Sequence, residues 1–232
     1  MKWVSRTHIG HVRASNQDAL LIQKNLYGVA DGMGGHKAGD IASRMAVLML
    51  GRVLEDAVPS EYLLRAGIEE INALVYERQM EDEALSGMGT TITVLWEGSD
   101  FVLLGHVGDS RAYLRRRGTL SQISQDHSMV GEMVRQGVIT KQMAERHPYR
   151  NIITKAIGTD QTVEPDILRL EKHPGDQWLL CTDGLTGYVK DDEIAMALER
   201  LSLDDAADVL LQQALDAGGG DNVSFVLTEV TP

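Results

Sequence analysis

The sequence contains very little cysteine and no long apolar run. Its 232 residues include a single cysteine, Cys181, so no disulfide can form within the chain and a reducing compartment is expected. No stretch approaches the roughly 20 apolar residues that span a bilayer. The first ten residues, MKWVSRTHIG, also lack the apolar segment of a signal peptide. These absences predict a cytoplasmic protein that does not enter a membrane.

Aromatic residues and net positive charge are scarce as well. Aromatics make up 5% of the chain, so aliphatic side chains must fill the core. The formal net charge of −12 argues against a nucleic-acid partner, because a protein that binds duplexes needs a basic face. The one dense basic cluster, residues 115–117, precedes Gly118 and is interpreted as the solvated end of a hairpin. Without a low-complexity linker or an internal repeat, residues 1–232 are expected to form a single domain.

Apolar runs rich in β-branched residues predict strands separated by helices. The expected strands cover residues 19–22, 26–30, 90–96, 101–107, 111–114, 178–182 and 223–230. Helices are expected over 38–55, after Ser60, and from Ser202 to Leu215. In the first of these, Ile41, Met45, Leu48 and Met49 share one apolar face. Because strands and helices do not alternate regularly, this order favours an α+β fold with mainly antiparallel strands.

The polar segment from about 127 to 155 differs from its surroundings. It contains a short amphipathic piece around Val130 and a second possible helix from Thr140. We expect it to form an excursion from the main body of the domain.

Five aspartates stand at similar places in this pattern. Four of them follow an apolar strand or a glycine cluster and have glycine beside them: Asp31, Asp109, Asp183 and Asp221. The fifth, Asp18, precedes the first of the expected strands. Any one Asp-Gly pair is most simply a turn. Several carboxylates at neighbouring strand ends, however, repel one another unless cations neutralise them.

The ligand chemistry suggests which cation this would be. The set offers only oxygen donors, without a histidine or cysteine pair at metal-binding spacing, which favours Mg²⁺ or Mn²⁺ over zinc. Glycine at position 32 leaves its backbone carbonyl able to coordinate as well. Two such ions about 3.5–4 Å apart can activate a water for attack on phosphorus. Arg13, just upstream of Asp18, has a guanidinium fork that suits a phosphate dianion.

Taken together, the motifs resemble the metal-dependent protein phosphatases of type 2C in their compact bacterial form. The matching stretches occur in family order over nearly the whole chain: RASNQD at 13–18, VADGMGGH at 29–36 followed by Ala42-Ser43, MGTT at 88–91, VGDSRAY at 107–113, DHS at 126–128, LCTDGL at 180–185 and GGDN at 219–222. The resemblance implies a four-layer α-β-β-α sandwich, two antiparallel sheets flanked by helix pairs. It also implies hydrolysis of phosphoserine and phosphothreonine on proteins.

The resemblance further implies the role of each carboxylate. Asp31 would bridge two metal ions, Asp183 and Asp221 would complete the first site, and the Gly32 carbonyl would help to form the second. Asp18 would act on the second site through water.

Three further roles follow from the same resemblance. Asp109, with Asp183, would supply a looser third metal site. Arg13 would bind the phosphate, and residues 127–155 would correspond to the mobile flap of bacterial members.

One position departs from the family pattern. Some members place a histidine directly after the Asp-Gly pair as a general acid, whereas this chain has Met33. His36, three residues further on, and a water on the third metal are the candidate proton donors. His127 is interpreted as a structural or flap residue.

Four other functions were weighed against this one. A nucleotide loop at 32–39 lacks the glycine or the Lys-Ser/Thr pair that such loops need. A cysteine phosphatase would need arginine where Gly187 stands, six residues after Cys181. A phosphoprotein-binding pseudophosphatase and a phosphatase of small phosphate esters stay open as alternatives. The expected partners are a cognate serine/threonine kinase and its targets, and the chain is expected to be a monomer.

Overall fold

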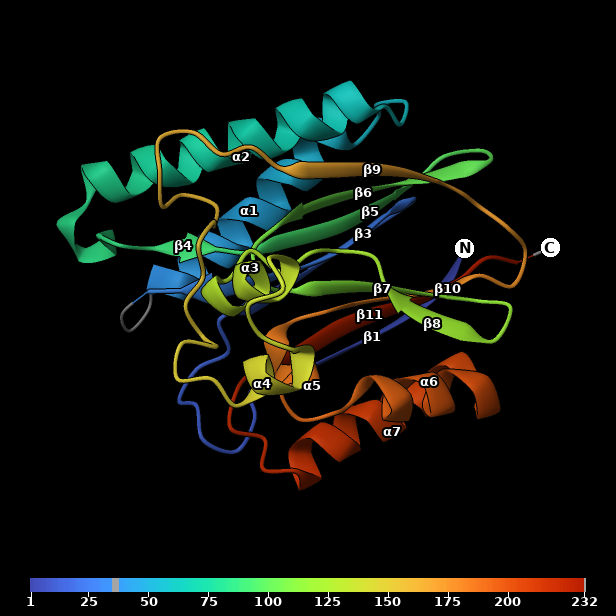
Figure 1. The fold of residues 1–232 in the computed structure, drawn as a ribbon. Helices are drawn as coiled ribbons and strands as arrows, with labels where there is room; N and C mark the ends of the chain where they lie inside the picture. Colours follow the sequence, from blue (N-terminus) through green and yellow to red (C-terminus); the bar gives the residue numbers. More distant parts are fainter. Residues whose placement is uncertain (35–37, 232) are drawn as a thin grey trace.

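The structure, a computed structural model, describes residues 1–34 and 38–231. Two antiparallel sheets lie face to face, with helices on both outer faces (Figure 1). In spatial order, the first sheet contains β1 (Lys2–His8), β11 (Val223–Glu229), β10 (Gln177–Cys181), β7 (Arg111–Arg116) and β8 (Thr119–Gln122). The second contains β2 (Asp18–Gln23), β3 (Leu26–Met33), β5 (Ile92–Glu97), β6 (Phe101–Val107) and β9 (Asp166–Glu171), and the short β4 (Gly89–Thr90) pairs with β3. The expected sandwich architecture is confirmed.

The two sheets bury an apolar layer between them. Alternate residues of the strands point into this layer because side chains alternate across a strand. Trp178 and Tyr27 are its largest members, and each is at most 1% exposed. This core fixes the two sheets relative to each other, and therefore fixes the strand ends from which the predicted site is built.

Helices α1 (Ala38–Leu54) and α2 (Glu61–Glu81) cover the second sheet (Figure 1). The side chain of Ser60 caps α2 by accepting a hydrogen bond from Leu63 N (3.2 Å), as its place before the apolar series predicts. The short 3-10 helix Glu83–Leu85 follows α2.

The expected apolar face of α1 packs only in part: Met45 and Met49 lie against the core as partly buried side chains. Ile41 and Leu48 are 38% and 59% exposed, while the fully buried residues of α1 include Ala42, Ala46 and Leu50. Small residues face the sheet because the helix approaches it closely: a Cβ on Gly39 would lie 2.7 Å from the carbonyl oxygen of Gly32.

The first sheet is covered by α6 (Asp191–Arg200) and α7 (Leu203–Asp216), with the short α5 (Asp183–Thr186) between β10 and α6. The expected start of α7 is confirmed, since Ser202 accepts a hydrogen bond from Asp205 N (3.2 Å). The sequence order predicts a second helix pair, but α6 and strands β1, β8 and β9 were not located along the chain. The three strands are short or half-exposed, so their alternation of apolar and polar residues is weak. Helix α6 is amphipathic and buries Ile194, Ala197 and Leu198.

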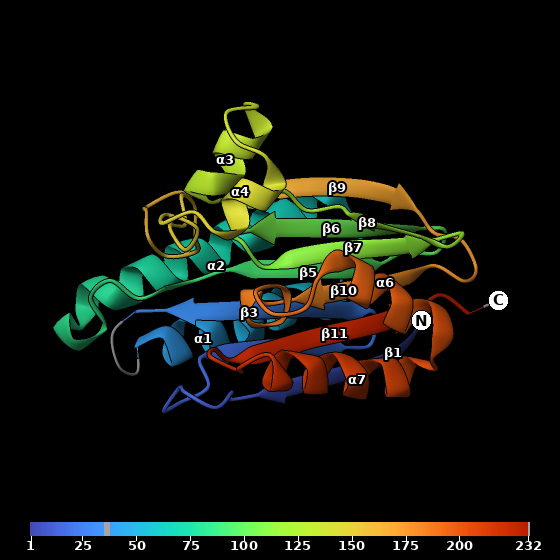
Figure 2. The ribbon, with the colours of Figure 1, turned by 60° about the horizontal axis from the view of Figure 1, so that its bottom comes forward.

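Between β8 and β9 the chain leaves both sheets. Helices α3 (Met129–Arg135) and α4 (Lys141–Glu145) stand outside them, as Figure 2 shows most clearly. Thr140 caps α4 by accepting from Met143 N (3.2 Å), at the helix start that the sequence predicts. The assignment of this segment as a flap remains a prediction.

The predicted hairpin end at residues 115–117 is observed, but it is less solvated than expected. Arg117 and Gly118 adopt positive φ angles of 52° and 82°, as a two-residue turn between β7 and β8 requires. Arg116, just before the turn, is bound to the buried carboxylate of Asp176 at 2.8 and 2.7 Å. Within the part of the chain that is described, no helix is both long enough and apolar enough to span a bilayer.

Candidate metal centre

Two aspartates face each other across neighbouring strands. Asp18 is the first residue of β2, and the antiparallel register pairs it with Asp31 of β3. The sequence predicted that Asp31 directly follows a strand that ends at residue 30. Strand β3 instead continues through Met33, so Asp31 lies within it. Asp18 is buried (7% exposed), whereas Asp31 keeps some exposed surface.

The other three aspartates reach the same place from two loops and from the start of a short helix. Asp109 follows the end of β6, Asp183 begins α5 directly after β10, and Asp221 precedes β11. The charges of Asp18, Asp183, Asp109 and Asp221 all act on Asp31. The structure therefore brings all five predicted carboxylates together at one edge of the sandwich.

Burial and the charges of neighbouring carboxylates raise the pKa values of Asp18, Asp31, Asp109 and Asp183. Burial raises the pKa of Asp18 to about 7, although hydrogen bonds from Ser224 and Thr182 oppose the shift. Burial also raises the pKa of Asp109 to about 7, helped by the charge of Asp183. For Asp31 and Asp183 the pKa is raised by burial and then by neighbouring carboxylates. Such a cluster holds its full negative charge only when cations compensate it.

The donor set fits a hard divalent cation. The Oδ1 atom of Asp18 is buried without a hydrogen-bond partner, and all five side chains offer oxygen. Within residues 1–34 and 38–231, no three carboxylate, imidazole or thiol side chains form a ready-made cage for an ion. The carboxylates are held instead by Thr182, whose Oγ1 donates to Asp18 (3.0 Å), and by a hydrogen bond between Asp31 and Asp183. The latter bond needs a proton on one of the two groups, which a cation would replace.

Arg13 lies at the rim of this cluster and pairs with one of its carboxylates. Its Nη2 lies 2.7 Å from Asp221 Oδ2, and its side chain is 51% exposed. The hydrogen bond to Asp221 and the charges of Asp31 and Asp183 raise the pKa of Arg13. The guanidinium is thus anchored at the rim of the site while it remains accessible from outside.

Backbone contacts fix Asp31 independently of its carboxylate. Its N–H donates to Thr91 Oγ1 (2.8 Å), and its carbonyl accepts from Thr91 N (2.9 Å) and Thr90 Oγ1 (2.9 Å). The two threonines belong to the MGTT stretch, whose role the sequence did not disclose. Thr90 ends β4, and Thr91 separates it from β5, so the expected strand 90–96 is divided in two.

A second support ties the Arg13 loop to the Asp221 loop. The side-chain amide of Asn222 accepts from Gln17 N (2.8 Å) and donates to the carbonyls of Ile9 (2.9 Å) and Ser15 (3.0 Å). The sequence alone indicated no role for Asn222. Its position in the GGDN motif was the available signal.

Gly32 has a packing reason to be glycine. A Cβ there would lie 2.6 Å from the carbonyl oxygen of Gln17 and would also overlap the carbonyl of Gly39. The Gly32 N–H donates to the Gln17 carbonyl (3.1 Å). Coordination by the Gly32 carbonyl remains a prediction.

The remaining candidates fall in different places. His36 lies outside the described residues. His127 is buried, stacks on His106 with ring centroids 4.9 Å apart, and accepts a hydrogen bond from Gly108 N (3.1 Å). Burial raises the pKa of Cys181 to about 12, so its thiol stays protonated near neutral pH, which argues against a cysteine nucleophile.

Comparison with known proteins places the chain in a family. Residues 6–218 match the family model described as protein phosphatase 2C. The chain is 37% identical, over 99% of its length, to the serine/threonine protein phosphatase PstP of Mycobacterium tuberculosis, of which it covers 45%. It is 38% identical, over 97% of its length, to the serine/threonine phosphatase stp of Listeria welshimeri, of which it covers 94%.

A solved structure shows the same fold. The catalytic domain of PstP in complex with two manganese ions superposes with a TM-score of 0.92 at 35% identity, covering 100% of this chain and 98% of that one.

The fold thus matches that of the catalytic domain of a serine/threonine phosphatase that was solved with two manganese ions. The chain belongs to the protein phosphatase 2C family, and the predicted family and fold class are confirmed. It spans about half the length of the mycobacterial relative, 45%, and nearly the whole length of the Listeria relative, 94%.

Proposed function

We propose that this protein hydrolyses phosphoserine and phosphothreonine on other proteins, with divalent cations held by the five aspartates. The observation that carries the proposal is their convergence, with Arg13, at one edge of the sandwich. Five carboxylates placed together would destabilise the fold without compensation, so their assembly indicates a site built for cations. The relatives, which are serine/threonine phosphatases, support the same reaction.

In this proposal Asp31, Asp183, Asp221 and the Gly32 carbonyl hold two ions, with Asp18 acting through water. Asp109 and Asp183 would hold a third ion. Ions bound there supply Lewis acidity and an activated water for attack on phosphorus. Manganese is supported by the two ions in the PstP structure, and Mg²⁺ is proposed as the alternative because both ions prefer oxygen ligands.

Arg13 is proposed to bind the substrate phosphate. Its guanidinium now pairs with Asp221 (2.7 Å), and both a phosphate and a cation would compete with that pair. If Asp221 held a cation, the guanidinium fork of Arg13 would be free to bind a phosphate dianion. Arg13 would thereby have two partners, Asp221 and the substrate phosphate.

The proposed substrates are a cognate serine/threonine kinase and the proteins that it phosphorylates. A cytoplasmic location is proposed because Cys181 is a free, buried thiol. The monomeric state stays a prediction. A comparison of phosphoproteomes in cells with the active protein and with its Asp31→Asn variant would identify the substrates.

The decisive test is turnover of an aryl phosphate and of a phosphothreonine peptide by the purified protein. We expect hydrolysis with Mn²⁺ or Mg²⁺, none after chelation, and recovery when the metal is restored. Asp56→Asn, at an exposed aspartate beyond α1, is the matched control for Asp31→Asn and should keep full activity. Undiminished turnover after thorough metal removal would refute the mechanism. Phosphopeptide binding without turnover would indicate a pseudophosphatase, and turnover of small esters alone would indicate a different substrate class.

A further inference from the structure

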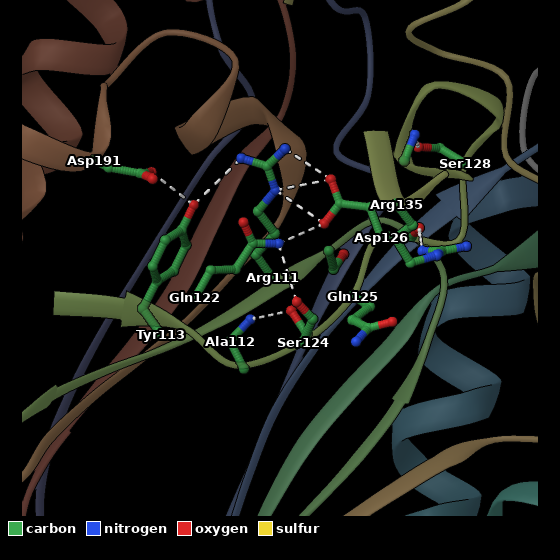
Figure 3. Close-up of polar contacts among 12 residues, drawn as sticks. Arg111, Ala112, Tyr113, Gln122, Ser124, Gln125, Asp126, Ser128, Arg135 and Asp191 are labelled. Atoms are coloured by element: carbon green, nitrogen blue, oxygen red, sulfur yellow. Dashed lines mark hydrogen bonds and ion pairs between the residues drawn. The ribbon is translucent and has the colours of Figure 1, made fainter. Parts of the chain in front are cut away.

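Arg111 lies at the centre of a polar network beside the metal centre. Its Nε and Nη2 atoms contact both carboxylate oxygens of Asp126 at 2.7–3.1 Å, and Nη1 lies 3.3 Å from Tyr113 Oη. Figure 3 shows the guanidinium between the Tyr113 hydroxyl and the Asp126 carboxylate. Gln122 also donates to Asp126 Oδ1 (2.8 Å), and Tyr113 donates to Asp191 at the start of α6 (2.9 Å). The planar fork of Arg111 therefore has one fixed orientation.

The network fastens two segments that are distant in sequence but adjacent at the site. Arg111 stands two residues after Asp109, and Asp126 directly precedes His127 at the start of the 127–155 segment. The same two stretches are also joined by His127 N donating to the Gly108 carbonyl (2.8 Å) and by Gly108 N donating to His127 Nδ1 (3.1 Å). The loop that carries Asp109 is thus bound on both sides to the base of the segment.

The far end of the segment returns to the same base. Thr154 N donates to the His127 carbonyl (2.8 Å), and Met129 N donates to the Ile152 carbonyl (2.9 Å). On the segment itself, Arg135 of α3 donates to the Asp126 carbonyl (3.0 Å). Asp126 is therefore bound through its side chain to Arg111 and through its backbone to α3. Asp126 and His127 are thus the two residues through which the segment is hydrogen-bonded to the stretch that carries Asp109.

The charges of the pair also act on Asp109. The pKa of Asp109 is raised by burial and, more weakly, by the charges of Asp183 and Asp126, whereas the charge of Arg111 lowers it. The two partners therefore oppose each other at this carboxylate.

We propose that Arg111 and Asp126 are positioning residues, which hold the Asp109 carboxylate in place by fastening its loop to the base of the 127–155 segment. Neither residue needs to touch the substrate. The importance of Asp109 for cation binding rests on the proposed function; the mechanical link between the loop and the segment does not.

The chain supplies a matched control on the same strand. Arg116, near the other end of β7, contacts Asp176 through the same two nitrogens at 2.8 and 2.7 Å. The two arginine side chains are equally exposed, at 30% each. The Arg116 pair lies between the β7–β8 hairpin and the β9–β10 turn, and none of the five aspartates is part of it. A purely structural role would make the two pairs behave alike.

The experiment compares Arg111→Lys and Asp126→Asn with Arg116→Lys and Asp176→Asn. The first readout is hydrogen exchange of the metal-free protein, which needs neither cation nor substrate. The first two variants should exchange faster by about tenfold over 105–111 and 126–155, the effect expected from losing one charge-assisted hydrogen bond. Beyond any uniform acceleration caused by lower global stability, the control variants should accelerate exchange only near 115–120 and 171–177.

The second readout is calorimetric titration with Mn²⁺ alone. Arg111→Lys and Asp126→Asn should weaken the weakest detectable site by about tenfold, as loss of a supporting partner typically does, and the controls should not. With an aryl phosphate, the same two variants should lower kcat and leave KM close to normal, because Arg13 is untouched.

Exchange over 126–155 that matches the controls would overturn the proposal, and so would unchanged Mn²⁺ affinity. If Arg111→Lys fails to fold, Gln122→Leu replaces it, because the Gln122 variant loses one contact to Asp126 and keeps the Arg111–Asp126 ion pair. Unchanged hydrogen exchange in Gln122→Leu would also count against the proposal. An inactive wild-type protein that showed the expected exchange pattern would refute the proposed function and retain the link.

Discussion

Each end of strand β7 carries an arginine–aspartate ion pair, and the two pairs have similar geometry but different surroundings. At one end Arg111 holds Asp126 beside five aspartates and the base of the 127–155 segment. At the other end Arg116 holds Asp176, and the buried carboxylate also accepts from His173 N (2.9 Å), which shapes the β9–β10 turn. The geometry of a salt bridge therefore does not reveal its role. The neighbours decide whether it supports a turn or a reactive centre.

The largest expected effect is on activity and stability when one carboxylate charge is removed near either end of β7. Asp31→Asn should lower activity by at least about 100-fold, because even the loss of a partner to a metal ligand costs 10–100-fold. It should leave the metal-free fold as stable as before or more stable, since it removes repulsion among the aspartates.

Asp176→Asn should have the opposite signature. It leaves Arg116 without its charged partner and should cost about 3 kcal/mol of stability, while activity per folded molecule stays normal. Thermal unfolding and turnover measured on the same preparations distinguish the two. Equal loss of stability in both variants would contradict the distinction between a carboxylate that serves the metal centre and one that stabilises a turn.

The second expectation is a pH dependence of stability that comes from the carboxylate end. The pKa of Asp18 is about 7 in the folded protein, against about 3.9 in an unfolded chain. The folded state therefore holds more protons between these values, and the free energy of unfolding falls as pH rises through that window. Without metal, the protein should melt at a lower temperature at pH 8 than at pH 5, and Mn²⁺ should reverse the loss at pH 8.

Asp18→Asn should flatten this pH dependence. Asp100→Asn, at an exposed hairpin on the second sheet, should leave it unchanged. A melting temperature of the metal-free protein that rises steadily from pH 5 to pH 8 would contradict the assignment of these raised pKa values.

The third expectation concerns Arg13. Arg13→Ala should raise KM for phosphopeptides by about tenfold, since a hydrogen bond between charged groups contributes about 1.5–3 kcal/mol. In the absence of substrate it should also tighten Mn²⁺ binding, because the guanidinium no longer competes for Asp221. Arg200→Ala, at the exposed end of α6, is the control. A loss confined to kcat would assign Arg13 to the transition state instead.

The smallest expected effect tests the proton donor. If His36 protonates the leaving alkoxide, His36→Ala should remove the high-pH limb of the kcat profile and leave KM unchanged. An unchanged limb would assign protonation to water at the metal centre. Met33 cannot serve, because its thioether carries no proton to give.

The amino-acid sequence by itself determined the family, the sandwich and the five aspartates, because these depend on local patterns. A strand that ends in Asp and Gly, a serine that caps α2 and a hairpin spacing are all legible within about ten residues. The same local information indicated an oxygen-only ligand set and therefore the kind of cation.

Tertiary structure alone decided which groups meet. Arg13 pairs with Asp221 across 208 positions, and β1 lies beside β11 at the opposite end of the chain. The packed face of α1 was misjudged because the close approach at Gly39 favours small residues over large apolar ones. Arg111 and Asp126 form a pair because the turn of β7 into β8 brings them together, and no local pattern encodes that distance. Local sequence thus specified the chemistry, and packing between distant segments specified its geometry.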